Sequence, residues 1–194
     1  MASGAELRFP ELSALQGARV LVTGGSGFLG SHICELLNRV GAMVTIFDIA
    51  KPRFEVAECI IGDLNDLRAL RAAVAGKFVV FHVASPSATS SNPATFYRVN
   101  VEGTRNVIQA CVLEGVSRLV HTSSASVVFD GTNQRNVDEA HPLPVTPMDA
   151  YTHVCLCVRV CVCACVRVCC VFFFRFLFSV FVFSLSALRC RANY

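Results

Sequence analysis

Near its start the protein has the stretch Ala18-Arg-Val-Leu-Val-Thr-Gly-Gly-Ser-Gly-Phe-Leu-Gly30. Its first six residues predict a short buried strand, and four glycines follow at once. Gly25-x-Gly-x-x-Gly30 fits the dinucleotide fingerprint, while Gly24, Gly27 and Gly30 also fit a Gly-x-x-Gly-x-x-Gly register. Such a turn leaves no Cβ where a pyrophosphate approaches, and the next helix points free N–H groups at the phosphates. The stretch predicts a dinucleotide-binding turn; a glycine-rich turn without a ligand is the alternative.

Strands and helices alternate downstream of this turn. We expect strands over residues 18–23, 43–47, 55–61, 78–83 and 118–122, and helices over residues 29–40, 66–74 and 92–113. This alternation indicates a parallel sheet with helices on both faces. The predicted fold class is therefore α/β, a Rossmann-like doubly wound parallel sheet that is truncated after about five strands.

Asp48 follows Gly30 by eighteen residues and lies at the expected end of the second strand. A carboxylate there accepts hydrogen bonds from a ribose diol and repels a 2′-phosphate, so we expect NAD rather than NADP as the cofactor. A solvated loop acid is the alternative interpretation of Asp48.

Five segments carry a resemblance to a known family. They are Thr23–Gly30, Gly62-Asp-Leu64, His82-Val-Ala-Ser-Pro86, Tyr97-Arg-Val-Asn-Val-Glu-Gly-Thr-Arg-Asn106 and Thr122-Ser-Ser-Ala-Ser126. Together they closely resemble the extended short-chain dehydrogenase/reductases and, among these, the 3β-hydroxysteroid dehydrogenase family in its branch for 4-carboxysterols. The resemblance covers about residues 18–152. It implies NAD-dependent oxidation of a sterol 3β-hydroxyl in sterol biosynthesis.

The resemblance also implies which residues bind the cofactor. They are Gly24, Gly27, Phe28, Leu29, Gly30, Asp48, Asp63, Leu64, Ala84, Ser85 and Asn100. Within this set Asp63 would lie at the adenine ring, the Ala84 region would line the cleft, and Asn100 would be the structural asparagine of the central helix. We interpret His82 as a core histidine with satisfied hydrogen bonds rather than as a catalytic group.

The catalytic set of the family is a serine, a tyrosine and a lysine one helical turn after the tyrosine. The resemblance assigns Ser124, with its neighbour Ser123 as the alternative, and Tyr151. The phenolate would take the proton of the 3β-hydroxyl while a hydride passes from C3 to the nicotinamide. Cys155 stands at the lysine position, and a thiol with a reference pKa of about 8.5 cannot replace a fixed cation at pH 7. We therefore expect this chain to be impaired or inactive.

The composition changes abruptly after Asp149. No acid, lysine, glycine or proline follows, and residues 155–170 alternate cysteine with valine and arginine. A TG dinucleotide repeat gives this alternation in translation, and a T-rich tract gives the Phe-rich run behind it. We expect three parts: residues 1–17 as a leader, 18–152 as an incomplete NAD-binding domain, and 153–194 as a low-complexity tail from a translated intron.

Other interpretations of the tail stay open. Its Cys-x-Cys runs lack the spacing and turn residues of metal sites, so we expect no metal. Residues 168–188 hold fourteen Phe, Leu and Val against the single Arg175, which allows membrane association. The same residues suit aggregation-prone strands. Because the sheet would end at the fifth strand, we also expect an unpaired outer edge and poor solubility.

Net charge and cysteine spacing restrict the possible functions less than the motifs do. The net charge of +3 gives no argument for binding nucleic acid, and Cys34, Cys59 and Cys111 are spaced as reduced thiols. By resemblance, the complete enzyme would form a homodimer at the cytosolic face of the endoplasmic reticulum or at lipid droplets. Rival readings are a nucleotide-sugar epimerase, a dihydroflavonol reductase, or a catalytically dead fragment that binds cofactor or is tethered to a membrane.

Overall fold

The structure is a computed structural model that describes residues 14–56, 58–87, 92–132, 142–144, 146–147, 149, 151–155 and 157, and the backbone of residues 180–184. Its centre is a six-stranded sheet with the strand order β3-β2-β1-β4-β5-β6. The strands are β1 (Arg19–Thr23), β2 (Met43–Asp48), β3 (Glu58–Ile61), β4 (Val79–His82), β5 (Arg118–Thr122) and β6 (Val180–Ser184). The first five strands run parallel, which confirms the predicted doubly wound sheet.

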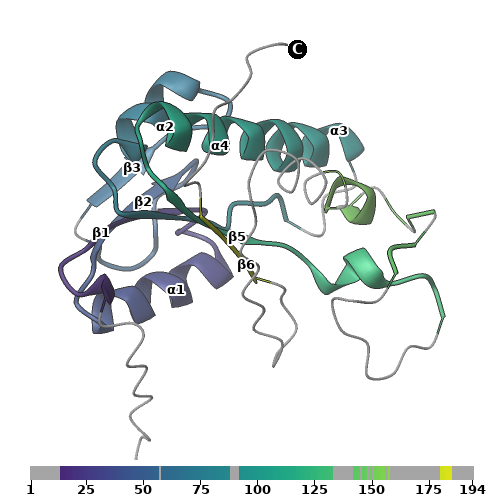
Figure 1. The fold of residues 1–194 in the computed structure, drawn as a ribbon, viewed down its shortest axis with the longest axis horizontal. Coiled ribbons are helices and arrows are strands. Elements are labelled where there is room, and N and C mark those ends of the chain that lie inside the picture. The colour runs from purple at the N-terminus through teal and green to yellow at the C-terminus, as the bar shows by residue number, and fades with distance from the viewer. Residues whose placement is uncertain are drawn as a thin grey trace, which may run out of the picture.

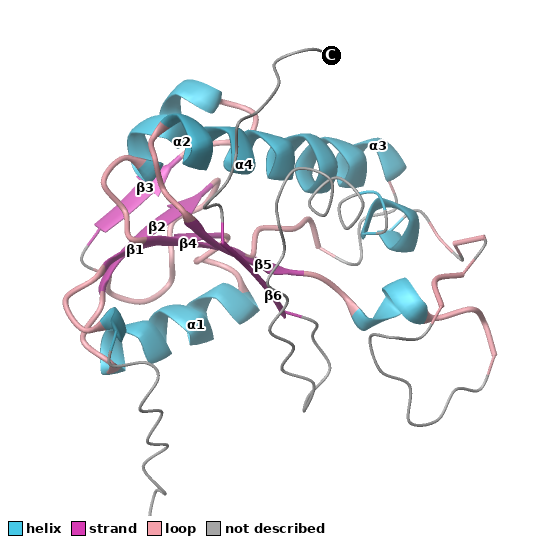
Figure 2. Ribbon diagram, viewed as in Figure 1, coloured by secondary structure: helices cyan, strands magenta, loops and turns pink. Residues whose placement is uncertain are grey.

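Helices cover both faces of this sheet (Figure 1). They are α1 (Phe28–Arg39), α2 (Leu67–Val74), α3 (Pro93–Phe96), a π-helix (Tyr97–Glu102) and α4 (Gly103–Leu113), and a 3₁₀ turn (Ala125–Val128) follows β5. Helix α1 lies on one face, while α2 and α4 lie side by side on the other (Figure 2). Alternate residues of β1 serve the two faces, since Val20 and Val22 pack with Cys34 of α1 and Leu21 packs with Val107 of α4.

The order of the strands places the ligand site. The chain winds outward from β1 to β3 and then crosses back to β4 on the other side of β1. In open parallel sheets the crevice at this reversal, outside the carboxyl ends of the strands, is where ligands bind. The glycine-rich turn after β1 lies at that point.

The long helix expected over residues 92–113 is not regular. Asn92 caps its start by accepting a hydrogen bond from the N–H of Ala94 at 3.0 Å, and α3 then gives way to the π-helix before α4 begins. Single turns of π-helix inside α-helices are frequent at functional sites. Apolar spacing does not reveal this interruption, because the buried positions before and after it keep a nearly helical period.

The outer edge of β5 is paired. Strand β6 runs antiparallel to it, with Arg118 opposite Ser184 and Thr122 opposite Val180. The prediction of an unpaired edge is therefore wrong, because five residues of the tail supply a sixth strand. The rest of the candidate membrane segment 168–188 lies outside the described residues. Among those that are described, no helix is long and apolar enough to cross a membrane.

Candidate active site

The glycine-rich turn between β1 and α1 brings backbone into unusually close contact. Gly24 has φ +72°, and a Cβ there would lie 2.6 Å from Cα of Ala84. A Cβ on Gly30 would lie 2.1 Å from the carbonyl oxygen of Gly24. Gly27 is the N-cap of α1, so the first turn of that helix opens directly from the loop. Only glycine fits at Gly24 and Gly30, because a side chain at either position would overlap neighbouring backbone.

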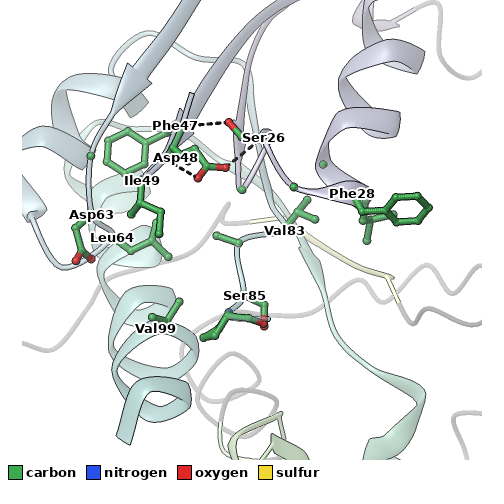
Figure 3. A pocket seen from close by; sticks show the side chains of 18 of the residues that line it. Ser26, Phe28, Phe47, Asp48, Ile49, Asp63, Leu64, Val83, Ser85 and Val99 are labelled. Carbon is green, nitrogen blue, oxygen red and sulfur yellow. Dashed lines mark hydrogen bonds between the residues drawn. The ribbon is translucent and has the colours of Figure 1, made fainter. Parts of the chain in front are cut away.

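A cleft of about 540 Å³ opens beside this turn (Figure 3). The glycine turn, the ends of β2 and β3, the loop after β4 and the π-helix region form its walls. Ten of the eleven predicted cofactor-binding residues line it: Gly24, Gly27, Phe28, Leu29, Gly30, Asp48, Asp63, Leu64, Ala84 and Ser85. The exception is Asn100. The cleft also contains residues that sequence reasoning missed, among them Ser26, Ala50, Gly62 and Arg98.

Asp48 is held at the rim of the cleft by backbone donors. Its Oδ2 accepts the N–H of Ser26 at 2.9 Å and its Oδ1 accepts the N–H of Ala50 at 3.1 Å. The Ser26 hydroxyl donates in turn to the carbonyl of Ala50 at 2.7 Å (Figure 3). Asp48 is therefore oriented by the glycine turn itself, unlike a freely solvated loop acid. Ser26 was hidden from sequence reasoning because it occupies a variable position of the glycine pattern.

Asp63, just after the neighbouring strand β3, supplies a second carboxylate to the cleft. Its Oδ1 accepts both the backbone N–H and the side-chain amide of Asn65 at 2.9 Å. Arg98 lies 3.8 Å from its other oxygen. The N–H of Asn65 is the main cause that holds the pKa of Asp63 below its ordinary value, and partial burial opposes it. Asp63 is therefore a stable acceptor for polar groups entering the cleft.

Ser124, Tyr151 and Cys155 come together beyond the cleft lining. Ser124 Oγ accepts the N–H of Ser126 at 3.2 Å and its hydroxyl at 2.9 Å, so the Ser124 proton is free to go elsewhere. Ser124 and Cys155 both act on the Tyr151 phenol: Ser124 lowers its pKa and Cys155 raises it. The serine bonded to Tyr151 is Ser124, not its neighbour Ser123. Phe96 fixes the tyrosine ring from one side, edge to face, with ring centroids 5.6 Å apart.

The electrostatics of this group oppose base catalysis. Burial, with a smaller contribution from Cys155, raises the pKa of Tyr151 to about 12, although the Ser124 hydrogen bond works against it. Burial likewise raises the pKa of the Cys155 thiol to about 11. Both groups are neutral at pH 7. A lysine at this position would act in the opposite direction, because a nearby cation favours the phenolate.

Two buried polar residues complete the surroundings. His82 is 1% exposed and both of its ring nitrogens lie within hydrogen-bonding distance of threonine hydroxyls, which confirms it as a core histidine. Asn100 lies in the π-helix, and its Oδ1 is buried without a hydrogen-bond partner among the described residues. A cofactor role for Asn100 stays a prediction.

Comparison with known proteins places this site in a family. The 3-beta hydroxysteroid dehydrogenase/isomerase family matches the chain over residues 21–157. Sterol-4-alpha-carboxylate 3-dehydrogenase, decarboxylating, of Homo sapiens is 45% identical over 139 residues, which are 71% of this chain and 37% of the human protein. The chain thus spans little more than a third of the length of that relative.

Solved structures with the same fold carry NAD. A short-chain dehydrogenase/reductase superfamily protein from Agrobacterium tumefaciens with bound NAD has a TM-score of 0.67 at 31% identity, covering 74% of this chain and 44% of that one. MoeE5 in complex with UDP-glucose and NAD also has a TM-score of 0.67, at 32% identity, covering 75% of this chain and 48% of that one. The family match and the human relative together show that this chain belongs to the 3-beta hydroxysteroid dehydrogenase/isomerase family.

Proposed function

We propose that the cleft binds NAD and that this chain is the cofactor-binding part of an NAD-dependent 3β-hydroxysteroid dehydrogenase for 4-carboxysterols. The glycine turn carries the proposal, because a Cβ at Gly24 or Gly30 would overlap backbone and this close-packed turn lines the cleft together with Asp48. The NAD-bound structures of the same fold support the cofactor. The name of the human relative supports the substrate. When bound, NAD supplies the hydride acceptor.

The residues of this chain divide the remaining work. The first turn of α1 and the glycine backbone receive the pyrophosphate. Asp48 accepts the hydroxyls of the adenosine ribose, and Asp63 accepts polar hydrogen from the adenine side. Ser124 holds the 3β-oxygen of the sterol, and Tyr151 takes its proton. A 3-keto-4-carboxysterol is a β-keto acid, which loses carbon dioxide readily once formed.

We infer further that this chain removes that proton poorly at neutral pH. With the pKa of Tyr151 at about 12, only about one molecule in 10⁵ has the phenolate at pH 7. Cys155 contributes to this high pKa, after burial. With a neutral Tyr151, the site can hydrogen-bond the oxygen of an alcohol or a ketone more readily than it can oxidise an alcohol.

Rival readings are less well supported. MoeE5, a solved relative with a sugar nucleotide, is 32% identical, whereas the human sterol enzyme is 45% identical. This difference favours the sterol branch over a nucleotide-sugar epimerase. Homodimerisation, a location at the endoplasmic reticulum or lipid droplets, and the origin of the tail in an intron stay predictions.

Titration calorimetry with NAD and NADP tests the cofactor assignment. We expect the 194-residue chain to bind NAD more tightly than NADP. Asp48→Asn should weaken NAD binding by about 10- to 100-fold, since hydrogen bonds to a charged group are lost. Asp66→Asn is the matched control, because Asp66 caps α2 through the N–H of Ala69 and lies outside the cleft lining. Absence of NAD binding, or equal affinity for NADP, would overturn the proposal.

A further inference from the structure

Three buried polar side chains, Thr23, His82 and Thr104, form a hydrogen-bonded chain between the sheet and α4. His82 Nδ1 lies 2.7 Å from the hydroxyl oxygen of Thr23, and His82 Nε2 lies 2.8 Å from that of Thr104. Thr23 and Thr104 are 0% and 2% exposed. The chain therefore joins the end of β1, the end of β4 and the first turn of α4 without contact with water.

One arrangement gives all the hydrogen bonds between Thr23, His82 and Thr104 the same direction. The Thr23 oxygen accepts the N–H of Ala84 in a long bond of 3.5 Å, so its own proton can go to His82 Nδ1. If Thr23 donates to Nδ1, His82 carries its hydrogen on Nε2 and donates it to the Thr104 hydroxyl. Burial, and to a lesser extent the neighbouring His121, holds the pKa of His82 well below its ordinary value. The imidazole is therefore neutral, as this arrangement requires.

The Thr23 end of this hydrogen-bonded chain reaches the cleft, and the Thr104 end does not. Ala84 lines the cleft and is the residue against which Gly24 packs, with room for no Cβ between them. The N–H of Val83 also bonds the carbonyl of Thr23, at 3.2 Å. Thr104 lies at the other end, in α4, and is not among the residues lining the cleft.

We propose that His82 is a positioning residue for the dinucleotide: through Thr23 it holds the Ala84 backbone against the glycine turn and so sets the width of the cleft. The Thr104 bond anchors the imidazole and has no direct effect on the ligand. The ligand identity rests on the proposed function; the positioning of Ala84 does not.

Two isosteric variants separate these roles. Thr23→Val and Thr104→Val each replace a hydroxyl by a methyl group and each remove one hydrogen bond of His82. We expect similar losses in melting temperature, but a rise of about tenfold in the calorimetric Kd for NAD only in Thr23→Val, the effect of one lost hydrogen bond. Thr104→Val should change that Kd less than about twofold, and Thr23→Ser should restore it. Equal effects of the two valine variants, or none in Thr23→Val, would overturn the proposal.

A second pair guards against misfolding of Thr23→Val. In His82→Asn the amide lies where Nδ1 was and can still bond Thr23, whereas His82→Gln reaches toward Thr104. His82→Asn should therefore bind NAD more tightly than His82→Gln, and the reverse order would contradict the positioning role.

A readout without NAD keeps this inference apart from the proposed function. Amide hydrogen exchange in the peptide covering residues 83–86 should speed up in Thr23→Val and stay unchanged in Thr104→Val. If the wild-type chain binds no NAD, the proposed function fails while exchange still decides the role of His82. Unchanged exchange in Thr23→Val would refute that role.

Discussion

Burial and the side chain at position 155 together set the proton chemistry of Tyr151. Cys155 is 8% exposed and adds to the effect of burial in raising the pKa of Tyr151, so it stabilises the neutral tyrosine. The Ser124 bond favours the phenolate but does not overcome burial. The geometry of a serine–tyrosine pair is therefore present without the charge that makes the tyrosine a base. This departure was readable from the sequence, because the spacing from Tyr151 to Cys155 is one helical turn.

Restoring the charge should lower the pKa of Tyr151. In Cys155→Lys we expect a fall of about 1–3 units, because an ammonium group one turn away favours the phenolate. Tyrosinate absorbance during an alkaline titration measures it, with Tyr151→Phe subtracting the other tyrosines. Cys155→Met is the control, since it removes the thiol and adds no charge. A Tyr151 pKa as high in the lysine variant as in the methionine variant would contradict this account.

At the scale of secondary structure, what could be read from the sequence depended on how local its cause was. The strand, glycine turn and helix at residues 19–39 were predicted because turn sterics and apolar period act over a few residues. The π-helix and β6 were not predicted. The first changes the hydrogen-bonding pattern and leaves the apolar pattern almost intact. The second pairs residues 118–122 with 180–184, and no local signal specifies such a distant partner.

The same limit applies to the candidate site. Residues that the motifs name line the cleft. Ser26 and Arg98 line it as well, but their contacts with Asp48 and Asp63 form only in the folded protein. Their contribution depends on neighbours distant in sequence. The motifs therefore predicted most of the cleft lining and missed the residues that contact Asp48 and Asp63.

The glycine turn offers a test with an internal control. Gly24 and Gly17 have almost the same φ, +72° and +71°, but a Cβ on Gly17 meets nothing within 4 Å. Gly17→Ala should cost about 1–2 kcal/mol of unfolding free energy, the cost of the left-handed conformation. Gly24→Ala should cost a further ~1–3 kcal/mol, because the Ala84 backbone must move.

Denaturant unfolding and NAD titration of both variants check this expectation. Only Gly24→Ala should lose NAD binding. Equal costs of the two substitutions would mean that the turn and the loop after β4 are not in the close contact described here.

On the scale of the whole molecule, each of the two hydrophobic cores contains a buried thiol that makes the free energy of unfolding depend on alkaline pH. Cys34 lies in the core under α1 and Cys111 in the core under α4, and both are free and fully buried. Burial raises the pKa of each to about 12. An unfolded thiol ionises near its reference value of about 8.5, so the two states bind different numbers of protons above that pH.

Stability should therefore fall as the pH rises from about 9 toward 12. A pKa that is raised in the folded state gives stabilisation that is complete below the unfolded pKa and is lost as the pH approaches the folded one. Each thiol should contribute a slope of up to ~1.4 kcal/mol per pH unit, since the native state keeps a proton that the unfolded chain has released. Denaturant unfolding under reducing conditions at pH 8, 9.5 and 11 measures the slope. Cys34→Ala with Cys111→Ala should reduce it and leave the part due to Cys155 and Tyr151, whose pKa values are also raised, whereas Val22→Ala, a core truncation without a thiol, should lower stability equally at every pH. A double variant with the wild-type slope would show that these thiols ionise in the folded core, and that the packing on the two faces of the sheet is looser than their burial requires.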